Sequence, residues 1–429
     1  MGGLFASRFV RSVVVVATGT SGAQAITMAF APLITRIYGP EVFGHSGTFM
    51  AMVEVAIPLA ALAYPIAIVL PRDDRDALGL ARLSAFLSLG IALLTAAALW
   101  VGGSWLVAVF DAESMADFLL LVPLAMLFAA WTQIAQQWLI RKGGYAAIAR
   151  AAIAQSMILN AAKAGIGWFH PTAATLIVIT TLGHALHAAL LFFGTRLRCQ
   201  SRANEHLKGS VTSLPQLARH HRDFPLYRAP QNFINAASQS LPVLMLAALS
   251  GPASAGFYTL GRMVMGVPSS LVGKAVSDVF YPRITDAAHN GENLARHILR
   301  ATGGLFAVGI VPFGLVVLFG RWLFSFVFGP EWAMAGEYAR WLALFFLFNL
   351  INKPCVAAVP VLGIQRGLLV YEVFSTSGKL IGLALGFYWF DSDIWGVALF
   401  SVTGVVAYVV MMYWIYTHAL RWGAHAKAG

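Results

Sequence analysis

The chain has 429 residues, of which 59% are Ala, Val, Ile, Leu, Met, Phe, Trp, Tyr or Cys and only 11% are Asp, Glu, Lys or Arg. A soluble domain is about half apolar and about one quarter charged, so the apolar excess must face lipid. This composition excludes a soluble enzyme, a nucleic-acid-binding protein and a disordered protein. The net charge of +11 is typical of Lys and Arg collecting in loops on one side of a membrane.

Apolar runs cover most of the chain. Because a spanning helix needs about 20 mainly apolar residues, roughly twelve spans account for them. The runs predict spans at residues 12–35, 42–70, 83–102, 118–139, 151–169, 173–194, 229–250, 257–280, 298–320, 338–362, 368–390 and 394–418. The first run is too long for a cleaved signal peptide, so we expect an uncleaved first span. The predicted fold class is an all-α polytopic membrane protein.

The charge of the connecting segments predicts the orientation. The segment 195–228 alone holds Arg196, Arg198, Arg202, Lys208, Arg219, Arg222 and Arg228. The segments expected on the opposite side hold only Arg36, Arg321 and Arg340. Since Lys and Arg are retained on the cytoplasmic side, both termini are expected in the cytoplasm.

The two halves of the chain share landmarks in the same order. A Gly-Pro turn follows the first and the seventh span, the next span ends at a Pro-Arg pair, and a Trp-Leu pair comes later; these are Gly39-Pro40 and Gly251-Pro252, Pro71-Arg72 and Pro282-Arg283, Trp105-Leu106 and Trp322-Leu323. Six spans separate equivalent points, so the repeats are parallel. We expect an N-lobe at 1–194, a basic cytoplasmic linker at 195–228 and a C-lobe at 229–429, with two six-helix lobes around a central cavity.

Five short sequence motifs resemble those of one protein family, and they occur in the same order along the chain. They are LITRIYGPEVFG at 33–44, IVLP at 68–71, DFPLY at 223–227, AGFY at 255–258 and FGPEW at 328–332. These motifs are similar to those of bacterial polysaccharide transporters of the O-antigen flippase kind. The resemblance implies the multidrug/oligosaccharidyl-lipid/polysaccharide flippase fold and a location in the bacterial inner membrane. It also implies an undecaprenyl-diphosphate-linked oligosaccharide as substrate, with membrane lipids, a polysaccharide polymerase and export machinery as partners.

One position departs from the family pattern. Members often carry a Tyr-Glu pair before the IVLP motif, whereas this chain has Tyr64-Pro65. If that glutamate couples transport to an ion, this protein must couple by other means. Glu54, the carboxylate expected near mid-membrane, is our candidate for ion coupling.

Catalytic signatures are absent from the sequence. It contains no HExxH, GxSxG, P-loop, GxGxxG or CxxC motif, and its His residues show no ligand spacing. We therefore predict a transporter with no catalytic residue, no metal site, no cofactor and no nucleic-acid partner.

Cations inside spans are the main functional signal. Lys163, Arg262, Lys353 and Lys379 lie within predicted spans, where each costs a few kcal/mol unless it faces a cavity or a partner. Arg and Lys are natural ligands of phosphate. We therefore expect these four residues to bind the diphosphate-sugar head group. The competing interpretation is that some reach the interface or pair with backbone carbonyls.

Polar stripes on two predicted spans add candidate sugar ligands. The first span carries Gln24 between two threonines, and the seventh carries Asn232, Asn235 and Gln239 on one face. Amides offer both donors and acceptors to sugar hydroxyls. The alternative is hydrogen bonding between helices. On the eleventh span, Gly378, Gly382 and Gly386 predict close approach of another helix.

The predicted function is translocation of a lipid-linked oligosaccharide by alternating access. One alternative is a multidrug or cation antiporter of the same fold, for which acidic cavity residues would be expected. A second is a membrane-embedded polysaccharide polymerase, which would need a large outer loop or paired carboxylates. Asp73, Asp74 and Asp76 form the tightest acidic cluster, but they lie among arginines in a short loop.

Overall fold

The computed structural model describes residues 2–109, 113–199 and 213–425, and within these ranges it is nearly all helix and contains no strand. The contacts divide the chain into two compact units, Met1–Ala255 (unit 1) and Gly256–Gly429 (unit 2). The all-α fold is therefore confirmed. Unit 1 includes the helix at 229–250, which packs against α2; the division into an N-lobe, linker and C-lobe stays a prediction.

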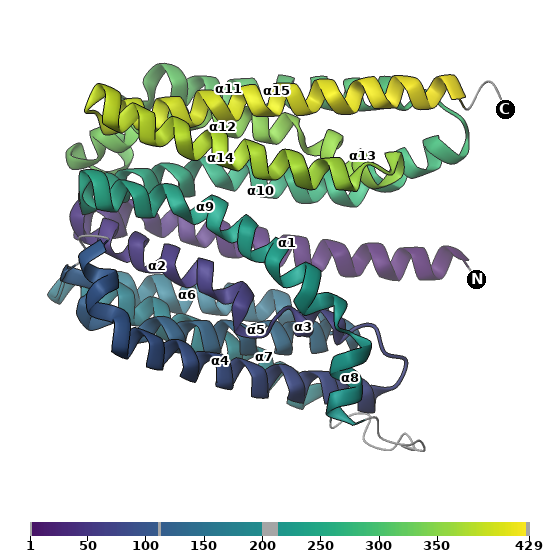
Figure 1. The fold of residues 1–429 in the computed structure, drawn as a ribbon, viewed down its shortest axis with the longest axis horizontal. Helices are drawn as coiled ribbons and strands as arrows, with labels where there is room; N and C mark the ends of the chain where they lie inside the picture. Colours follow the sequence, from purple (N-terminus) through teal and green to yellow (C-terminus); the bar gives the residue numbers. More distant parts are fainter. Residues whose placement is uncertain (1, 110–112, 200–212, 426–429) are drawn as a thin grey trace. The chain divides into compact units, whose positions relative to one another are not determined.

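Unit 1 is built from long helices with short ones between them (Figure 1). Its elements are α1 (Gly2–Ile37), α2 (Pro40–Ala60), α3 (Tyr64–Ala67), α4 (Asp74–Val109), η1 (Glu113–Phe118), α5 (Leu121–Arg141), α6 (Tyr145–Phe169), α7 (Ala173–Cys199), α8 (Leu214–His220), η3 (Phe224–Arg228) and α9 (Ala229–Ser250). Helix α1 packs on α6, α5 packs on α7, and α2 packs on α5 and α9.

Unit 2 is also built from long helices with short ones between them (Figure 1). Its elements are α10 (Pro252–His289), which begins just before the boundary, α11 (Leu294–Phe328), η4 (Pro330–Trp332), α12 (Ala333–Ile351), α13 (Lys353–Leu362), α14 (Gln365–Phe390) and α15 (Asp393–His425). Helix α11 packs on α12, and α15 packs on α11, α12 and α14.

The long helices carry the surface that a bilayer requires. Eight helical stretches of the described residues are long and apolar enough to cross a membrane, and each predicted span overlaps at least one long helix. Large apolar side chains are widely exposed, among them Trp100 (81%) and Trp389 (80%). Because such exposure in water would be strongly unfavourable, these surfaces face lipid. The chain is a multi-pass membrane protein.

The predicted span at 42–70 is wrong in one respect, because the helix breaks within it. Helix α2 ends at Ala60, and Leu62 and Ala63 adopt left-handed backbone angles with φ of 49° and 59°. Non-glycine residues avoid this region because Cβ crowds the backbone. Pro65 supplies no N–H at the start of α3. No glycine marks this break in the sequence, and the residues around it are apolar. Neither a glycine nor the hydropathy therefore predicts where the helix ends.

The predicted span at 338–362 is also divided. Helix α12 ends at Ile351 and α13 begins at Lys353, with Pro354 in its first turn. Proline lacks the amide that would bond to the carbonyl four residues earlier. Asn352, fully buried at this junction, donates to Met411 Sδ at 3.4 Å.

The glycine face on α14 packs as predicted. A Cβ atom added at Gly386 would lie 2.5 Å from both N and Cα of Gly396 on α15, and one at Gly382 would lie 3.1 Å from the Leu399 carbonyl oxygen. The two helices therefore approach through backbone rather than side chains, which is the role of small residues between membrane helices.

We expect Gly386→Ala to destabilise the protein, because the new methyl group meets backbone that cannot rotate away. Overpacking of this kind costs about 1–3 kcal/mol. The measurement is the thermal midpoint of purified protein in detergent. Gly314→Ala on α11 is the matched control, since nothing lies within 4 Å of a Cβ there. Equal midpoints for the two variants would contradict the close approach.

Candidate functional site

Glu54 connects two helices of unit 1. It lies half-buried on α2, and its Oε2 accepts a hydrogen bond of 3.1 Å from Oγ of Ser240 on α9. Ser240 is fully buried. A carboxylate within a membrane requires such partners, because leaving it unpaired in hydrocarbon is costly. The contact also places Glu54 beside α9, the helix that carries Asn232, Asn235 and Gln239.

Lys163 lies on α6, six residues before the helix ends at Phe169. In the described part of the chain its ammonium forms no ion pair, and its backbone carbonyl accepts a hydrogen bond of 2.9 Å from the Tyr38 hydroxyl. His184 on α7 lies within electrostatic reach of both Lys163 and Glu54. Three helices therefore bring two charges and an imidazole together in unit 1.

His184 is not conspicuous in the sequence, because the histidines are scattered along the chain. The usable signal was the i, i+3 spacing of His184 and His187, which places both on one face of α7. Their Nε2 atoms are buried and have no hydrogen-bond partner among the described residues.

The polar residues around Gln24 mainly join α1 to α6. Thr27 Oγ1 lies 3.0 Å from Ser156 Oγ, Ser156 donates to the Ala23 carbonyl at 2.8 Å, and Asn160 Nδ2 donates to Thr27 Oγ1 at 3.3 Å. These bonds fit the packing alternative for that part of the stripe. Gln24 itself is half-buried one turn earlier.

The amide stripe on α9 is more open. Asn232 is half-buried, whereas Asn235 and Gln239 are exposed. Gln239 Nε2 donates to Asn235 Oδ1 at 2.7 Å, which orients both amides. Each amide has more hydrogen-bonding capacity than this one bond uses.

In unit 2, Arg262 lies on α10, and Lys353 of α13 packs against the same helix. Arg262 is half-buried on this helix, one turn after the buried Tyr258. Lys353 begins α13 at the break after Asn352, and a Cβ at Gly273 of α10 would lie 3.3 Å from its Cε atom. The aliphatic part of Lys353 is therefore packed, and its ammonium forms no ion pair with any described residue.

Lys379 lies on α14 among aromatic and small residues. Its Nζ is 5.8 Å from the centre of the Phe345 ring, a cation–π contact. Its side chain passes beside Gly404 of α15, and Glu372 lies two turns earlier within electrostatic reach. The contact with Phe345 stabilises the cation only partly, so Lys379 keeps donors for a ligand.

A hydrogen-bonded chain crosses three helices of unit 2. Ser269 Oγ on α10 donates to Asn349 Oδ1 on α12 at 2.8 Å, and Asn349 Nδ2 donates to the Tyr408 hydroxyl on α15 at 2.6 Å. The sequence did not reveal this chain, because each helix contributes one polar residue and so shows no periodic pattern.

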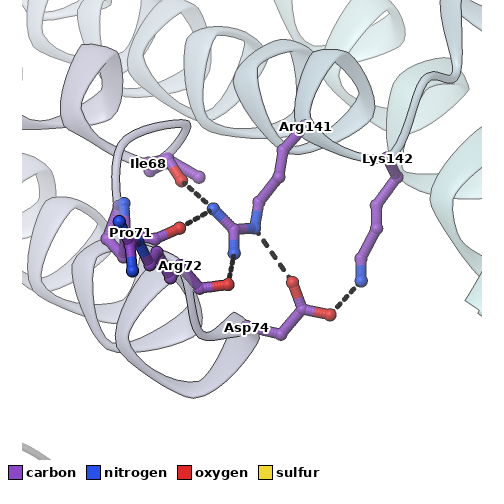
Figure 2. Close-up of polar contacts among 6 residues, drawn as sticks. All are labelled: Ile68, Pro71, Arg72, Asp74, Arg141 and Lys142. Carbon is purple, nitrogen blue, oxygen red and sulfur yellow. Dashed lines mark hydrogen bonds and ion pairs between the residues drawn. The ribbon is translucent and has the colours of Figure 1, made fainter. Parts of the chain in front are cut away.

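At one end of unit 1, Arg141 holds the loop between α3 and α4 (Figure 2). Its Nε donates to Asp74 at 2.9 Å, and its two terminal nitrogens donate to the carbonyl oxygens of Ile68 (3.3 Å), Pro71 (2.6 Å) and Arg72 (3.1 Å). Lys142 also contacts Asp74. The planar guanidinium is suited to this arrangement because its donors point in fixed directions. We call this set the Arg141 clamp.

A comparable connection joins α10 to α11 in unit 2. Arg283 donates to both carboxylate oxygens of Glu292, at 3.0 and 3.3 Å, and His297 lies 2.7 Å from the same carboxylate. Hydrogen bonds from Arg283 and His297 lower the pKa of Glu292 below its ordinary value. The loop charges of both units are thus partly neutralised within the protein.

A pocket of about 770 Å³ opens next to the Arg141 clamp, between the α3–α4 loop and the α8–η3 segment. Its wall mixes Arg72, His220 and His221 with Asp73, Asp76 and Asp223. Burial and the neighbouring His220 lower the pKa of His221. The balance of charges favours no single ligand.

The arrangement of helices is that of a known class of membrane transporters. It is similar to an inward-facing multidrug resistance MATE family transporter of the MOP superfamily, with a TM-score of 0.67 at 14% identity, covering 95% of this chain and 94% of that one. It is equally similar to the lipid II flippase MurJ in an inward closed conformation, with a TM-score of 0.68 at 12% identity, covering 97% and 91%. At these identities the likeness shows the fold.

Sequence comparison defines the family. Residues 33–337 match the family described as polysaccharide biosynthesis protein, and the chain belongs to that family. It is also 23% identical over 362 residues to the succinoglycan biosynthesis transport protein ExoT of Rhizobium meliloti (strain 1021), covering 82% of this chain and 68% of that protein. The predicted resemblance is confirmed, and family and fold together indicate a transporter rather than an enzyme.

We expect Arg141→Ala to lower stability by on the order of 3 kcal/mol, because three carbonyl groups and Asp74 lose a buried charged donor. The Arg141 side chain is only 10% exposed. The thermal midpoint in detergent checks this. Lys142→Ala is the control and should cost under about 1 kcal/mol, since its pair with Asp74 is partly exposed. Equal losses would contradict the role of the Arg141 clamp.

Proposed function

We propose that this protein translocates an undecaprenyl-diphosphate-linked oligosaccharide, the repeat unit of a surface polysaccharide or lipopolysaccharide, across the bacterial inner membrane by alternating access. The observation that carries the proposal is membership of the polysaccharide biosynthesis protein family over residues 33–337. The name of the relative from Rhizobium meliloti, a transport protein of succinoglycan biosynthesis, supports transport rather than synthesis.

The charges within the helices support an anionic substrate. Lys163 in unit 1 and Lys353 and Lys379 in unit 2 are half-buried within helices, and none forms an ion pair with a described residue. A cation kept in a membrane without a counterion needs a functional reason. A diphosphate supplies one, because Lys and Arg bind phosphate oxygens through strong charge-assisted hydrogen bonds. Arg262 is the fourth member of this proposed set.

The amides of α9 and Gln24 of α1 suit the sugar part of the substrate. Asn232, Asn235 and Gln239 lie on one helix and provide both donors and acceptors for hydroxyl groups. The polyprenyl chain needs no binding site of its own, since it stays in the lipid. A polysaccharide polymerase and export machinery would receive the product, and both termini would lie in the cytoplasm.

A multidrug antiporter of the same fold is the second candidate, because the likeness to a MATE transporter is as strong as that to MurJ. A cationic drug would be attracted by carboxylates. The half-buried lysines of both units repel it instead. The charge pattern therefore favours the anionic lipid-linked substrate.

We expect Arg262→Ala and Lys379→Ala each to reduce surface polysaccharide about ten- to a hundredfold in cells that lack the native gene. The loss of one charge-assisted contact to phosphate costs about 1.5–3 kcal/mol. Lipid-linked oligosaccharide should accumulate on the cytoplasmic leaflet, while the amount of protein in the membrane stays normal. Lys379→Arg should restore most of the export, because it keeps the charge.

Arg300→Ala is the matched control. Arg300 is exposed near the start of α11, outside the proposed set, and its loss should leave export unchanged. Export at the wild-type rate by both Arg262→Ala and Lys379→Ala would reject the diphosphate-binding role and favour the drug antiporter.

A further inference from the structure

Helix α7 carries two histidines, and one buried ring nitrogen of each forms no hydrogen bond with the residues that the structure describes. His184 and His187 are separated by one helical turn, and the Nε2 atom of each is buried with no hydrogen-bond partner in the described residues. A buried polar atom without a partner costs about 1–3 kcal/mol. A histidine used only for packing would be expected to satisfy both ring nitrogens.

The backbone of α7 is held at this level by its neighbours. Thr132 of α5 donates to the His184 carbonyl at 3.4 Å, and Gln155 of α6 donates to the Gly183 carbonyl at 3.3 Å. These contacts use the main chain of α7 and leave its imidazoles unused. The two buried Nε2 atoms therefore take no part in the hydrogen bonds that join α7 to α5 and α6.

Charges of opposite sign act on this pair. Lys163 from α6 and Glu54 from α2 both interact electrostatically with His184, and His184 in turn interacts with His187. A proton on His184 would be stabilised by the carboxylate and opposed by the ammonium. Burial also opposes the charged imidazole and is the largest of the three effects, and the two neighbouring charges act in addition to it.

We propose that Glu54, His184 and His187 form a proton-binding site in unit 1 whose occupancy is coupled to anion binding at Lys163. Imidazole suits this role because its proton exchanges near neutral pH, and chains of carboxylates and histidines serve as proton relays in membrane transporters. The coupling rests on the proposed function, since the anion is the diphosphate of the substrate; the proton site does not.

The coupling has a definite sign. An anion bound to Lys163 neutralises the charge that opposes protonation of His184, so the proton and the anion favour each other's binding. Because linkage is reciprocal, protonation of His184 strengthens anion binding by the same factor. Glu54 takes part as the counter-charge to the imidazolium.

The test follows the charge of each imidazole directly. Protein with ¹⁵N-labelled histidine in lipid nanodiscs is titrated from pH 8 to pH 5 by NMR, and signals are assigned by their loss in His184→Gln and His187→Gln. We expect His184 to become charged within this range. In Glu54→Gln it should do so at a lower pH, because the counter-charge is lost, and in Lys163→Gln at a higher pH, because the opposing charge is lost.

His170 provides the internal control, because it is exposed beyond the end of α6 and its NMR signal should be unaffected by the substitutions. A His184 that stays neutral at pH 5, or that titrates alike in Glu54→Gln, Lys163→Gln and the wild type, overturns the proton site. Inorganic pyrophosphate is then added to the wild type: a shift of the His184 titration to higher pH supports the coupling, and no shift rejects it.

The export assay separates this inference from the proposed function. If Arg262→Ala and Lys379→Ala export normally while His184 titrates as expected, the substrate assignment fails and the proton site stands. If those variants fail to export while His184 stays neutral, the substrate assignment stands and the proton site fails.

Discussion

The absence of water from the bilayer interior is the constraint on which this structure depends, since every polar group placed there must find a partner within the protein. The backbone meets this demand by forming helices. Side chains meet it by bonding between helices, as Thr27 does with Ser156 and as Ser269 does through Asn349 to Tyr408. Lys163, Lys353 and Lys379 form no ion pair with a described residue, and they belong to the proposed site.

The positions of the spans could be predicted because hydrophobic length is a property of local sequence. The close approach at Gly386 could be predicted because three glycines at i, i+4 spacing mark a flat helix face. The break after α2 could not, because the left-handed residues are Leu62 and Ala63. Neighbouring helices hold that conformation against its intrinsic cost, and no residue type in the sequence marks it.

Candidate cations could be found from sequence because an ionisable residue in an apolar run is conspicuous. What each residue contacts could not be found. Lys379 meets the ring of Phe345, and Glu54 meets Ser240, which is distant in the sequence. The i, i+3 spacing of His184 and His187 is visible in the sequence, but the charges of Lys163 and Glu54 that act on His184 come from two other helices. Such properties arise from packing and have no local pattern.

The Arg141 clamp has a consequence for how the protein meets charged lipids. Asp74 neutralises only one of the two charges of Arg141 and Lys142, whereas Glu292 neutralises the charge of Arg283, so these three residues of the Arg141 clamp keep one net positive charge. Exposed arginines such as Arg82, Arg219 and Arg222 add further positive charge, which anionic headgroups would attract if they lay nearby. A rise in salt concentration should screen these exposed arginines more strongly than the Arg141–Asp74 pair, because the Arg141 side chain is only 10% exposed.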